Sequence, residues 1–151
     1  MISIHSSSTA TCPCGSGQSY QACCQRCHHD HRAATHAETL MRSRYSAFVL
    51  GLSDYLLQTW HPTTRLAALD LSLDTTEWLG LEILRCQAGR PKDQHGKVTF
   101  KAYYRLAQGV GCLHEISRFC FQEGLWFYVD GKIKPVKILS EEFMASARPS
   151  K

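Results

Sequence analysis

The sequence of 151 residues has no apolar run long enough to cross a membrane. Charged residues interrupt its hydrophobic stretches every few positions, whereas a membrane-spanning helix needs roughly 18 or more consecutive apolar residues. Residues 1–10 also lack the basic segment and the apolar segment that a secretory signal peptide requires. These two absences argue against a membrane or secreted protein, and we expect a soluble protein of the cytoplasm.

Runs of basic residues are also absent. The 17 lysines and arginines are scattered along the chain and exceed the 13 acidic residues only enough to give a net charge of +4. Nucleic-acid-binding proteins usually concentrate basic residues in one segment or on one face, so nucleic acid is not an expected partner. Hydrophobic residues make up 44% and charged residues 20% of the chain, as in globular proteins. The length suits one domain with a sizeable core and a small appended module.

Cysteine is abundant by comparison, and half of it is concentrated near the start. The stretch 12–24, CPCGSGQSYQACC, holds four of the eight cysteines: Cys12, Cys14, Cys23 and Cys24. Because disulfides are rare in a reducing cytoplasm, this clustering favours a metal site. Zinc takes four tetrahedral ligands and binds thiolates well. Gly15 and Gly17 allow a tight backbone turn between the two cysteine pairs.

Zinc would also explain how so short a segment folds. The segment buries too little apolar surface to order itself. Structural zinc adds roughly 10–16 kcal/mol of apparent binding free energy in small modules. We therefore predict a zinc ion held by Cys12, Cys14, Cys23 and Cys24. A disulfide pair and a redox couple are the alternatives, the latter because Cys24 and Cys27 have the C-x-x-C spacing.

Further potential ligands follow the cluster. Cys27 or His28 could replace one of the four cysteines as a ligand. Together with His29 and His31, they could also bind a second ion. Otherwise these residues form a solvated polar linker, and their residue types are compatible with either role.

Composition divides the chain into three parts. Residues 1–11 are rich in Ser and Thr and are expected to form a disordered tail. Residues 12–34 contain the cysteine module and a polar connector, and residues 35–151 are predicted to form the main domain.

Helices are predicted at the start of the main domain. Thr35 and Glu38 have the spacing of a capping box, and apolar residues at helical spacing follow until Gly51. Ser53 is the predicted cap of a second helix. A third, short helix is predicted over 65–71.

From Glu77 onward the pattern changes to an alternation of apolar and polar residues, seen best over 98–106. This period of two indicates β-strands. Turn-forming residues between the apolar runs indicate a meander of antiparallel hairpins. These turns are predicted at 90–96, 108–111, 123–124 and 130–131. Helices followed by a curled antiparallel sheet define an α+β fold.

The stretch CPCGSGQSYQACC resembles the SEC-C motif, a short zinc-binding module at the C-terminus of the preprotein translocase ATPase SecA. The stretches at 40–48, 55–62 and 113–119 resemble the YchJ family of bacterial SEC-C proteins. This resemblance covers nearly the whole chain. It implies a SEC-C zinc knuckle joined to a cone-shaped domain of the nuclear transport factor two-like (NTF2-like), cystatin-like fold, with helices packed on a curled antiparallel sheet.

In SecA the module binds zinc through three cysteines and a histidine. Carried over by position, the ligands in this chain are Cys12, Cys14, Cys23 and Cys24, the last in place of the histidine. The SecA module also helps to contact the chaperone SecB and the ribosome, so the resemblance implies a protein partner of this kind. A homodimer is also possible.

Cone-shaped domains of this type commonly enclose a pocket between the helices and the sheet, and some relatives use Asp, His or Tyr there for dehydration or isomerisation. The pocket candidates in this chain are Arg42, Tyr45, His61, His114 and Arg118. Within one strand, His114 and Arg118 project to one face and Glu115 projects to the other. An acid–base pair formed by His114 and Glu115 is therefore disfavoured.

These observations favour three functions in order. A non-catalytic protein-interaction module ordered by zinc comes first, because no nucleophile lies at a recognisable spacing from a base. A dehydratase or isomerase that uses the cone pocket is the first alternative. A metal-handling protein that uses the additional cysteine and histidines is the second alternative.

Overall fold

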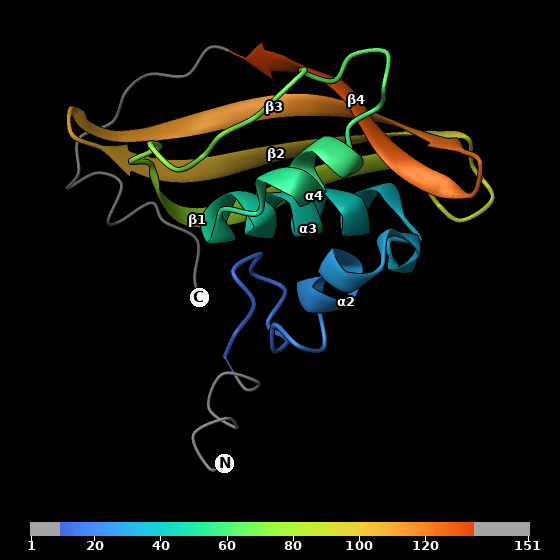
Figure 1. Cartoon of the computed structure of the whole chain (residues 1–151), viewed down its shortest axis with the longest axis horizontal. Helices are drawn as coiled ribbons and strands as arrows, with labels where there is room; N and C mark the ends of the chain where they lie inside the picture. The colour runs from blue at the N-terminus through green and yellow to red at the C-terminus, as the bar shows by residue number, and fades with distance from the viewer. Residues whose placement is uncertain (1–9, 135–151) are drawn as a thin grey trace.

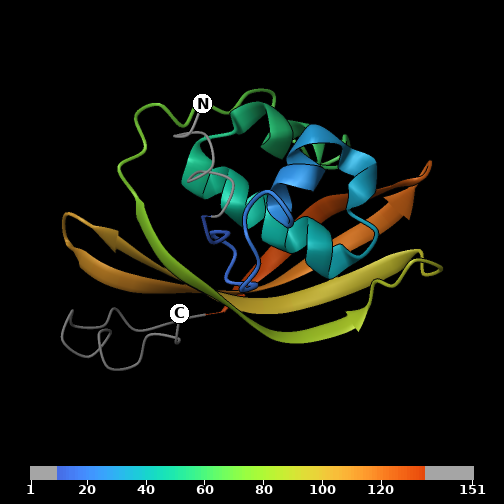
Figure 2. The same ribbon diagram turned by 90° about the horizontal axis from the view of Figure 1, so that it is seen from below.

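The computed structural model describes residues 10–134, in which short helices precede a four-stranded sheet. The elements in chain order are α2 (Cys24–His29), the 3-10 helix η1 (His31–Ala33), α3 (Ala37–Leu50), α4 (Ser53–Gln58), β1 (Glu77–Ala88), β2 (His95–Leu106), β3 (Gly109–Gln122) and β4 (Leu125–Lys134). The helices lie on one face of the sheet (Figure 1), and the sheet curves around them (Figure 2). The predicted α+β fold is confirmed. None of the helices in this part of the chain is long and apolar enough to cross a membrane.

The sheet is an antiparallel meander with the order β1-β2-β3-β4, as predicted. β-Bulges interrupt the pairing of β1 with β2 near Leu79 and Leu84, and the pairing of β3 with β4 after Arg118. Bulges bend a strand and increase its twist, which explains the curvature. The turn predicted at 130–131 is wrong, because Asp130 and Gly131 continue β4 by pairing with residues of β3.

The main core lies between α3 and the concave face of the sheet. Val98, Phe100 and Ala102 of β2 are all buried there, which confirms the predicted alternation. Trp126 of β4 is fully buried in the same core. Tyr103 points to the opposite face. There it forms a small second cluster with three other buried residues, namely Leu79, Val110 and Cys112.

Helix α3 starts one residue later than the sequence predicts, and the predicted capping box with Thr35 as the N-cap is wrong. Its N-cap is His36, whose side chain makes no capping hydrogen bond. The Thr35 hydroxyl is hydrogen-bonded to His36 Nδ1 instead, at 3.0 Å. The amide of Ala37 donates to the carbonyl of Gly89 at 2.9 Å, so a contact with the end of β1 supports the helix start. Gly51 ends the helix in the left-handed conformation, with φ 75°.

The segment after α4 differs from the prediction. Ser53 is the first residue of α4 rather than its cap, because Leu52 holds the N-cap position. No helix forms over 65–71, where the chain has no regular secondary structure and bends at Ala67. The chain leaves α4 along β4: the amide of His61 donates to the carbonyl of Tyr128 at 2.7 Å. A parallel bridge between Trp60 and Tyr128 ties the residues directly after α4 to the sheet.

The cysteine-containing stretch packs on α3 as part of the same core as the sheet. Cys12, Cys14, Cys24 and Cys27 belong to one hydrophobic cluster with residues of α3 and β2. At its start Thr11 forms an antiparallel bridge with Ser19. Residues 1–9 of the predicted tail and residues 135–151 of the predicted main domain lie outside the described residues.

Candidate metal centre

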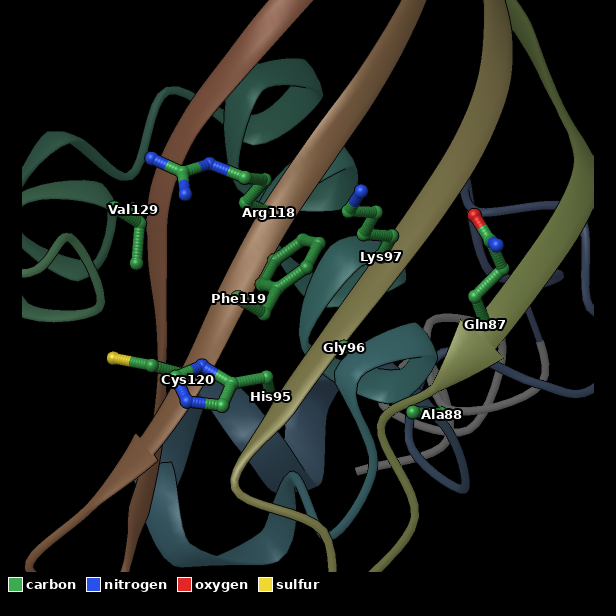
Figure 3. A pocket seen from close by; sticks show the side chains of 9 residues that line it. All are labelled: Gln87, Ala88, His95, Gly96, Lys97, Arg118, Phe119, Cys120 and Val129. Atoms are coloured by element: carbon green, nitrogen blue, oxygen red, sulfur yellow. The ribbon is translucent and has the colours of Figure 1, made fainter.

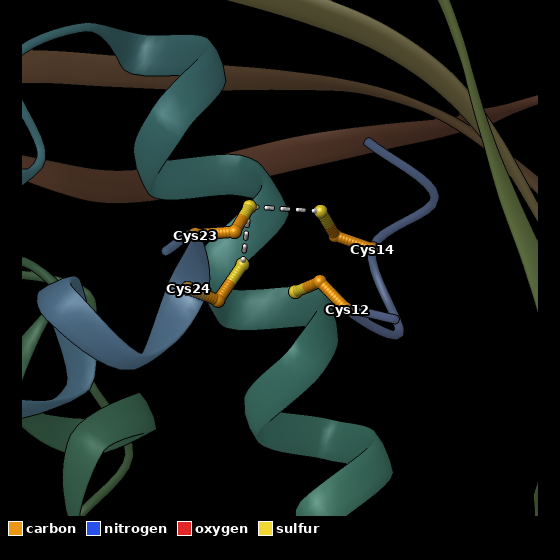
Figure 4. A group of neighbouring side chains, drawn as sticks. All are labelled: Cys12, Cys14, Cys23 and Cys24. Carbon is orange, nitrogen blue, oxygen red and sulfur yellow. Dashed lines mark hydrogen bonds between the residues drawn. The ribbon is translucent and has the colours of Figure 1, made fainter. Parts of the chain in front are cut away.

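The four predicted ligands come together in space. Cys12 and Cys14 lie on the loop before α2, while Cys23 and Cys24 lie at its start (Figure 4). The four sulfur atoms all lie within 4.8 Å of one another. The loop between the pairs turns at Gly15 and Gly17, which have φ 81° and 89°. Because L side chains rarely adopt this left-handed backbone, glycine at these positions permits the turn.

The cluster is mostly closed to solvent. Cys12, Cys14 and Cys24 are at most 3% exposed, whereas Cys23 is half-buried. Two hydroxyls lie beside the sulfurs: Ser16 Oγ is 3.1 Å from Cys23 Sγ, and Ser46 Oγ is 3.6 Å from Cys12 Sγ. Such hydroxyls can stabilise metal-bound thiolates. Four thiols at this separation, closed off by the fold, fit a tetrahedral metal ion.

The electrostatics of the thiols favour a bound cation. Hydrogen bonds from the neighbouring thiols Cys14 and Cys24 lower the pKa of Cys12. The hydrogen bond with Cys12, followed by that with Cys14 and by burial, raises the pKa of Cys24. Burial likewise raises the pKa of Cys23. The cluster by itself therefore accommodates few thiolates, and a dication would supply the charge that lets all four deprotonate.

Arg42 links the cluster to α3. Its Nη1 donates to the carbonyl of Cys14 at 2.8 Å, and its Nε donates to Glu38 at 3.0 Å. The guanidinium thus fixes the backbone of the ligand loop and adds a positive charge near the sulfurs. The sequence predicted Arg42 as a pocket residue, and the structure gives it this supporting contact beside the cluster.

The additional candidate ligands lie outside the group of four sulfurs. Cys27 is buried in the core, and burial raises the pKa of its thiol to about 11. His28 has both ring nitrogens in hydrogen bonds, Nδ1 with Tyr20 at 2.6 Å and Nε2 with the carbonyl of Ser43 at 2.8 Å. His31 Nε2 is hydrogen-bonded to the carbonyl of Trp126 at 2.7 Å. These histidines fasten the module to α3 and β4.

The other predicted pocket residues do not share one cavity. Tyr45 lines a cleft of about 500 Å³ between the cysteine loop and β1. His61 lies on the segment beside β4 and is hydrogen-bonded to Thr63 and Gln122. His114 and Arg118 project from the face of the sheet that points away from the helices, and Arg118 is paired with Asp130 there. A catalytic group built from these residues is not assembled.

Sequence reasoning missed Arg44, which is buried between α3 and the sheet. Its Nη1 donates to the carbonyl of Leu56 and to Thr59 Oγ1, both at 2.7 Å. Its guanidinium carbon lies 4.6 Å from the centroid of the Tyr128 ring, and burial lowers the pKa of Arg44 to about 10. The helical spacing held a signal, since Arg44 follows the buried Leu40 by four residues and therefore shares its face.

Glu115 belongs to the same buried polar layer. Its Oε2 accepts hydrogen bonds from Ser117 Oγ at 2.7 Å and from the Tyr128 hydroxyl at 3.1 Å. Glu115 faces the helices while His114 faces outward, as the strand alternation predicts. The two side chains therefore cannot act as an acid–base pair.

A cysteine loop of SEC-C type packed against a domain of helices on a curled sheet defines a SEC-C protein with an NTF2-like domain. Two family models match this division: "YchJ, middle NTF2-like domain" over residues 36–131 and "SEC-C motif" over residues 9–26. The chain belongs to the YchJ family. Both parts of the resemblance seen in the sequence are thereby confirmed.

Relatives in this family match most of the chain. A UPF0225 protein of Bordetella bronchiseptica is 49% identical over 132 residues, which cover 86% of this chain and 98% of the relative. A UPF0225 protein of Streptomyces coelicolor is 52% identical over 124 residues, which cover 82% of this chain and 96% of the relative. The similarity thus spans both the motif and the domain.

Two solved structures resemble this one. The solution structure of a SEC-C motif containing protein from Rhodopseudomonas palustris has a TM-score of 0.72 at 32% identity, covering 82% of this chain and 98% of its own. The crystal structure of a SEC-C motif containing protein from Psychrobacter arcticus has a TM-score of 0.65 at 29% identity, covering 87% of this chain and 86% of its own.

Proposed function

We propose that the cluster binds one zinc ion and that the metal orders the SEC-C loop as part of a non-catalytic protein-interaction surface. The observation that carries the proposal is the convergence of four cysteine sulfurs within 4.8 Å of one another. Zinc has no redox chemistry of its own and binds four thiolates in closed structural sites. Its role here is to hold the loop on α3.

The surface that zinc would stabilise is the cleft beside the loop. One wall is formed by the loop, including Pro13 and Gly15, and the other by Tyr45, Val49 and Trp78. An aromatic-lined cleft of about 500 Å³ is of a size and character that suits an apolar anchor of a partner. Because the cysteine loop forms one wall, loss of the metal would open the cleft.

The resemblance of the motif to that of SecA makes SecB and the ribosome the first partners to test, in a cytoplasmic setting. The choice rests on the motif alone. The proposal itself requires only that the partner dock where the cysteine loop and α3 meet.

The experiment combines metal analysis with a matched pair of variants. The reduced, purified protein is expected to contain about one equivalent of zinc by elemental analysis. Val49 and Leu50 are adjacent exposed residues of α3, 38% and 46% exposed, and of the two only Val49 lines the cleft. Val49→Asp should weaken binding to purified SecB or to ribosomes about tenfold or more, and Leu50→Asp should leave it nearly unchanged.

Two results would contradict the proposal. If the purified protein were fully ordered without stoichiometric metal, zinc would not be what orders the loop. Equal effects of Val49→Asp and Leu50→Asp on a measured interaction, or an interaction that survives zinc removal, would place the partner elsewhere.

A further inference from the structure

The face of the sheet that points away from the helices, called the outer face below, gathers basic side chains from β1 to β4. Alternate residues of a strand point to opposite faces, and Val98 and Phe100 mark the face covered by α3. The basic residues of the strands occupy the alternate positions and therefore project outward. They are Arg85, Lys97, Lys101, Arg105, Arg118, Lys132 and Lys134.

The strand register sets cationic side chains opposite one another. Lys97 of β2 is paired with Arg118 of β3. Lys101 of β2 is paired with His114, which is paired in turn with Lys134 of β4. Burial, followed by the charges of Lys101 and Lys134, lowers the pKa of His114. Like charges directly opposite one another destabilise a sheet, so this arrangement opposes folding stability and favours an external anion.

The carboxylates on this face are already engaged. Asp130 accepts two hydrogen bonds from Arg118, at 2.7 and 2.6 Å. Glu77 pairs with Arg105 at 3.1 Å, and Glu82 accepts from the Tyr103 hydroxyl at 2.8 Å. Between residues 10 and 134, no carboxylate forms an ion pair with four of the cations, namely Lys97, Lys101, Lys132 and Lys134. Glu82 keeps its negative charge opposite Lys101, but seven cations share the outer face with these three carboxylates, so its net charge is positive.

A cavity of about 460 Å³ lies beside these cations, where β1 ends and β2 begins. Lys97 and His95 project from β2, Arg118 from the neighbouring β3 and Gln87 from the neighbouring β1 (Figure 3). The volume falls in the range of small-ligand pockets. The imidazole and the amide can hydrogen-bond to the edge of a planar ring. A cavity with such groups beside cations is suited to a nucleotide.

We propose that the outer face binds single-stranded RNA, with the phosphates along the cation rows and one base in the cavity lined by His95 and Gln87. Three successive rows across the sheet each carry two cations: Lys97 with Arg118, Arg85 with Lys132, and Lys101 with Lys134. Neighbouring rows are two residues apart, which is about 6.6 Å along a strand. Evenly spaced cations suit the regular phosphates of a nucleic acid strand. An acidic polypeptide could meet the same lysines but has no base to place in the cavity.

This site is separate from the cysteine cluster. The SEC-C loop and α2 lie with the other helices on the concave side of the sheet (Figures 1 and 2). The proposal therefore adds a second binding surface and does not depend on the zinc-ordered cleft.

The test measures fluorescence anisotropy of a short labelled oligouridine with the purified full chain. Affinity is expected to fall with rising salt, with a log–log slope of about −0.7 for each phosphate contacted. Lys97→Glu should weaken binding about tenfold and make the salt dependence less steep, by about 0.7 in the log–log slope, because one phosphate contact is lost. Lys97→Arg should retain binding. Arg65→Glu is the matched control, because it makes the same charge change at an exposed residue beside α4.

A second arm tests the cavity. An abasic oligonucleotide with the same charge should bind the wild-type protein several-fold more weakly than oligouridine, and Gln87→Ala should abolish this difference. Three results would overturn the proposal: no salt-dependent binding of oligouridine, equal effects of Lys97→Glu and Arg65→Glu, or equal binding of oligouridine and polyglutamate at the same charge. The last result would assign the outer face to an acidic protein.

Discussion

Arg44 is a cation held between α3 and the sheet by backbone and side-chain acceptors. Replacing it by Met keeps much of the volume but leaves the carbonyl of Leu56 and the hydroxyl of Thr59 without their donor. Buried groups left in this way cost free energy. We expect Arg44→Met to lower the free energy of unfolding by about 2–4 kcal/mol, as measured by urea denaturation.

Arg65→Met is the control for this substitution. Arg65 is exposed, and its contact with the carbonyl of Leu57 is long, at 3.4 Å. Surface changes of this kind usually stay within about 0.5 kcal/mol. If the two variants were equally stable, the hydrogen bonds of Arg44 would contribute nothing to the fold.

Cys24 and Cys27 are both buried cysteines of α2, and only Cys24 belongs to the group of four sulfurs. Cys24→Ser should lower the zinc content of the purified protein from about one equivalent to near zero, because a thiolate ligand is lost. Cys27→Ser should leave the zinc content unchanged. Elemental analysis decides the matter, and loss of zinc from Cys27→Ser would make Cys27 a ligand.

At the residue scale the sequence was most informative where spacing alone determines the geometry. Cys12, Cys14, Cys23 and Cys24 are brought together as predicted, because the ligands lie close in the chain. Arg42 and Tyr45 were predicted to share a pocket with residues far along the chain, and they do not. Their partners, Cys14 and Gly80, depend on how α3 packs, which no local pattern specifies.

Among the secondary structure elements, the turn between β1 and β2 illustrates how tightly the sheet meets α3. A Cβ added to Gly96 would lie 2.6 Å from Gly89 Cα and 3.1 Å from Ala37 Cβ. Backbone atoms cannot move aside cheaply, so Gly96→Ala should destabilise the fold by about 1–3 kcal/mol. Gly80→Ala is the control, since a Cβ there meets no atom within 4 Å. Thermal unfolding of the two variants compares them, and equal midpoints would contradict the expected clash.

The 3-10 helix η1 joins the cysteine module to β4 through His31, and this contact should depend on pH. Burial lowers the pKa of His31, and nearby Arg44 lowers it further, while the carbonyl of Trp126 and Asp30 oppose the shift. Below a pH of about 6.5, His31 of the unfolded chain takes up a proton, whereas His31 of the folded chain stays neutral until a lower pH. Stability contributed by neutral His31 is complete above this pH and decreases as the pH falls.

The measurement is the free energy of unfolding between neutral and mildly acidic pH. The wild-type protein should lose up to about 1.4 kcal/mol per pH unit below pH 6.5 from this group. His31→Gln should show a smaller slope, because its amide can still donate to the carbonyl of Trp126 without titrating. Any loss of zinc at low pH affects both proteins, so their difference isolates His31. Parallel curves would show that His31 does not set the dependence.

At the element scale, strands were easier to predict than helix starts and short helices. The alternation over 98–106 identified β2 and its buried face, because a period of two is a local property. The start of α3 depends on the carbonyl of Gly89, which lies far along the chain. The predicted helix over 65–71 does not form. The residue before this segment is tied to β4, where Thr64 Oγ1 donates to the carbonyl of Val129 at 2.6 Å, and Leu69 and Leu71 pack against the main core.

The scattered basic residues show the same limitation. In the sequence they form no run, and nucleic acid was therefore not an expected partner. Lys97 and Lys101 are separated in sequence from Arg118, yet pairing of β2 with β3 places them on one face. A criterion based on runs cannot detect a charged face that a sheet assembles, and the RNA-binding experiment above now decides between the two expectations.

For the whole molecule, the decisive question is whether the cysteine module and the NTF2-like domain unfold together. The sequence predicted a boundary near residue 34, with the module and connector over 12–34. In the structure, Cys12, Cys14 and Cys24 share one hydrophobic cluster with Leu40 and Phe100. A shared core couples the stability of its parts, so the metal should stabilise the entire chain.

Removal of zinc with a strong chelator under reducing conditions should therefore lower the midpoint of a single unfolding transition. Circular dichroism of the sheet and fluorescence of the three tryptophans, which include the buried Trp126, should agree with each other on the midpoint, both before chelation and at the lower value after it, because both probes follow one cooperative unit. Readdition of zinc should restore the original midpoint. If chelation instead left the sheet transition in place while the α3 side of the cluster became exposed, the module would be an independent folding unit. The boundary near residue 34, predicted from composition, would then also separate two parts of the chain that unfold independently.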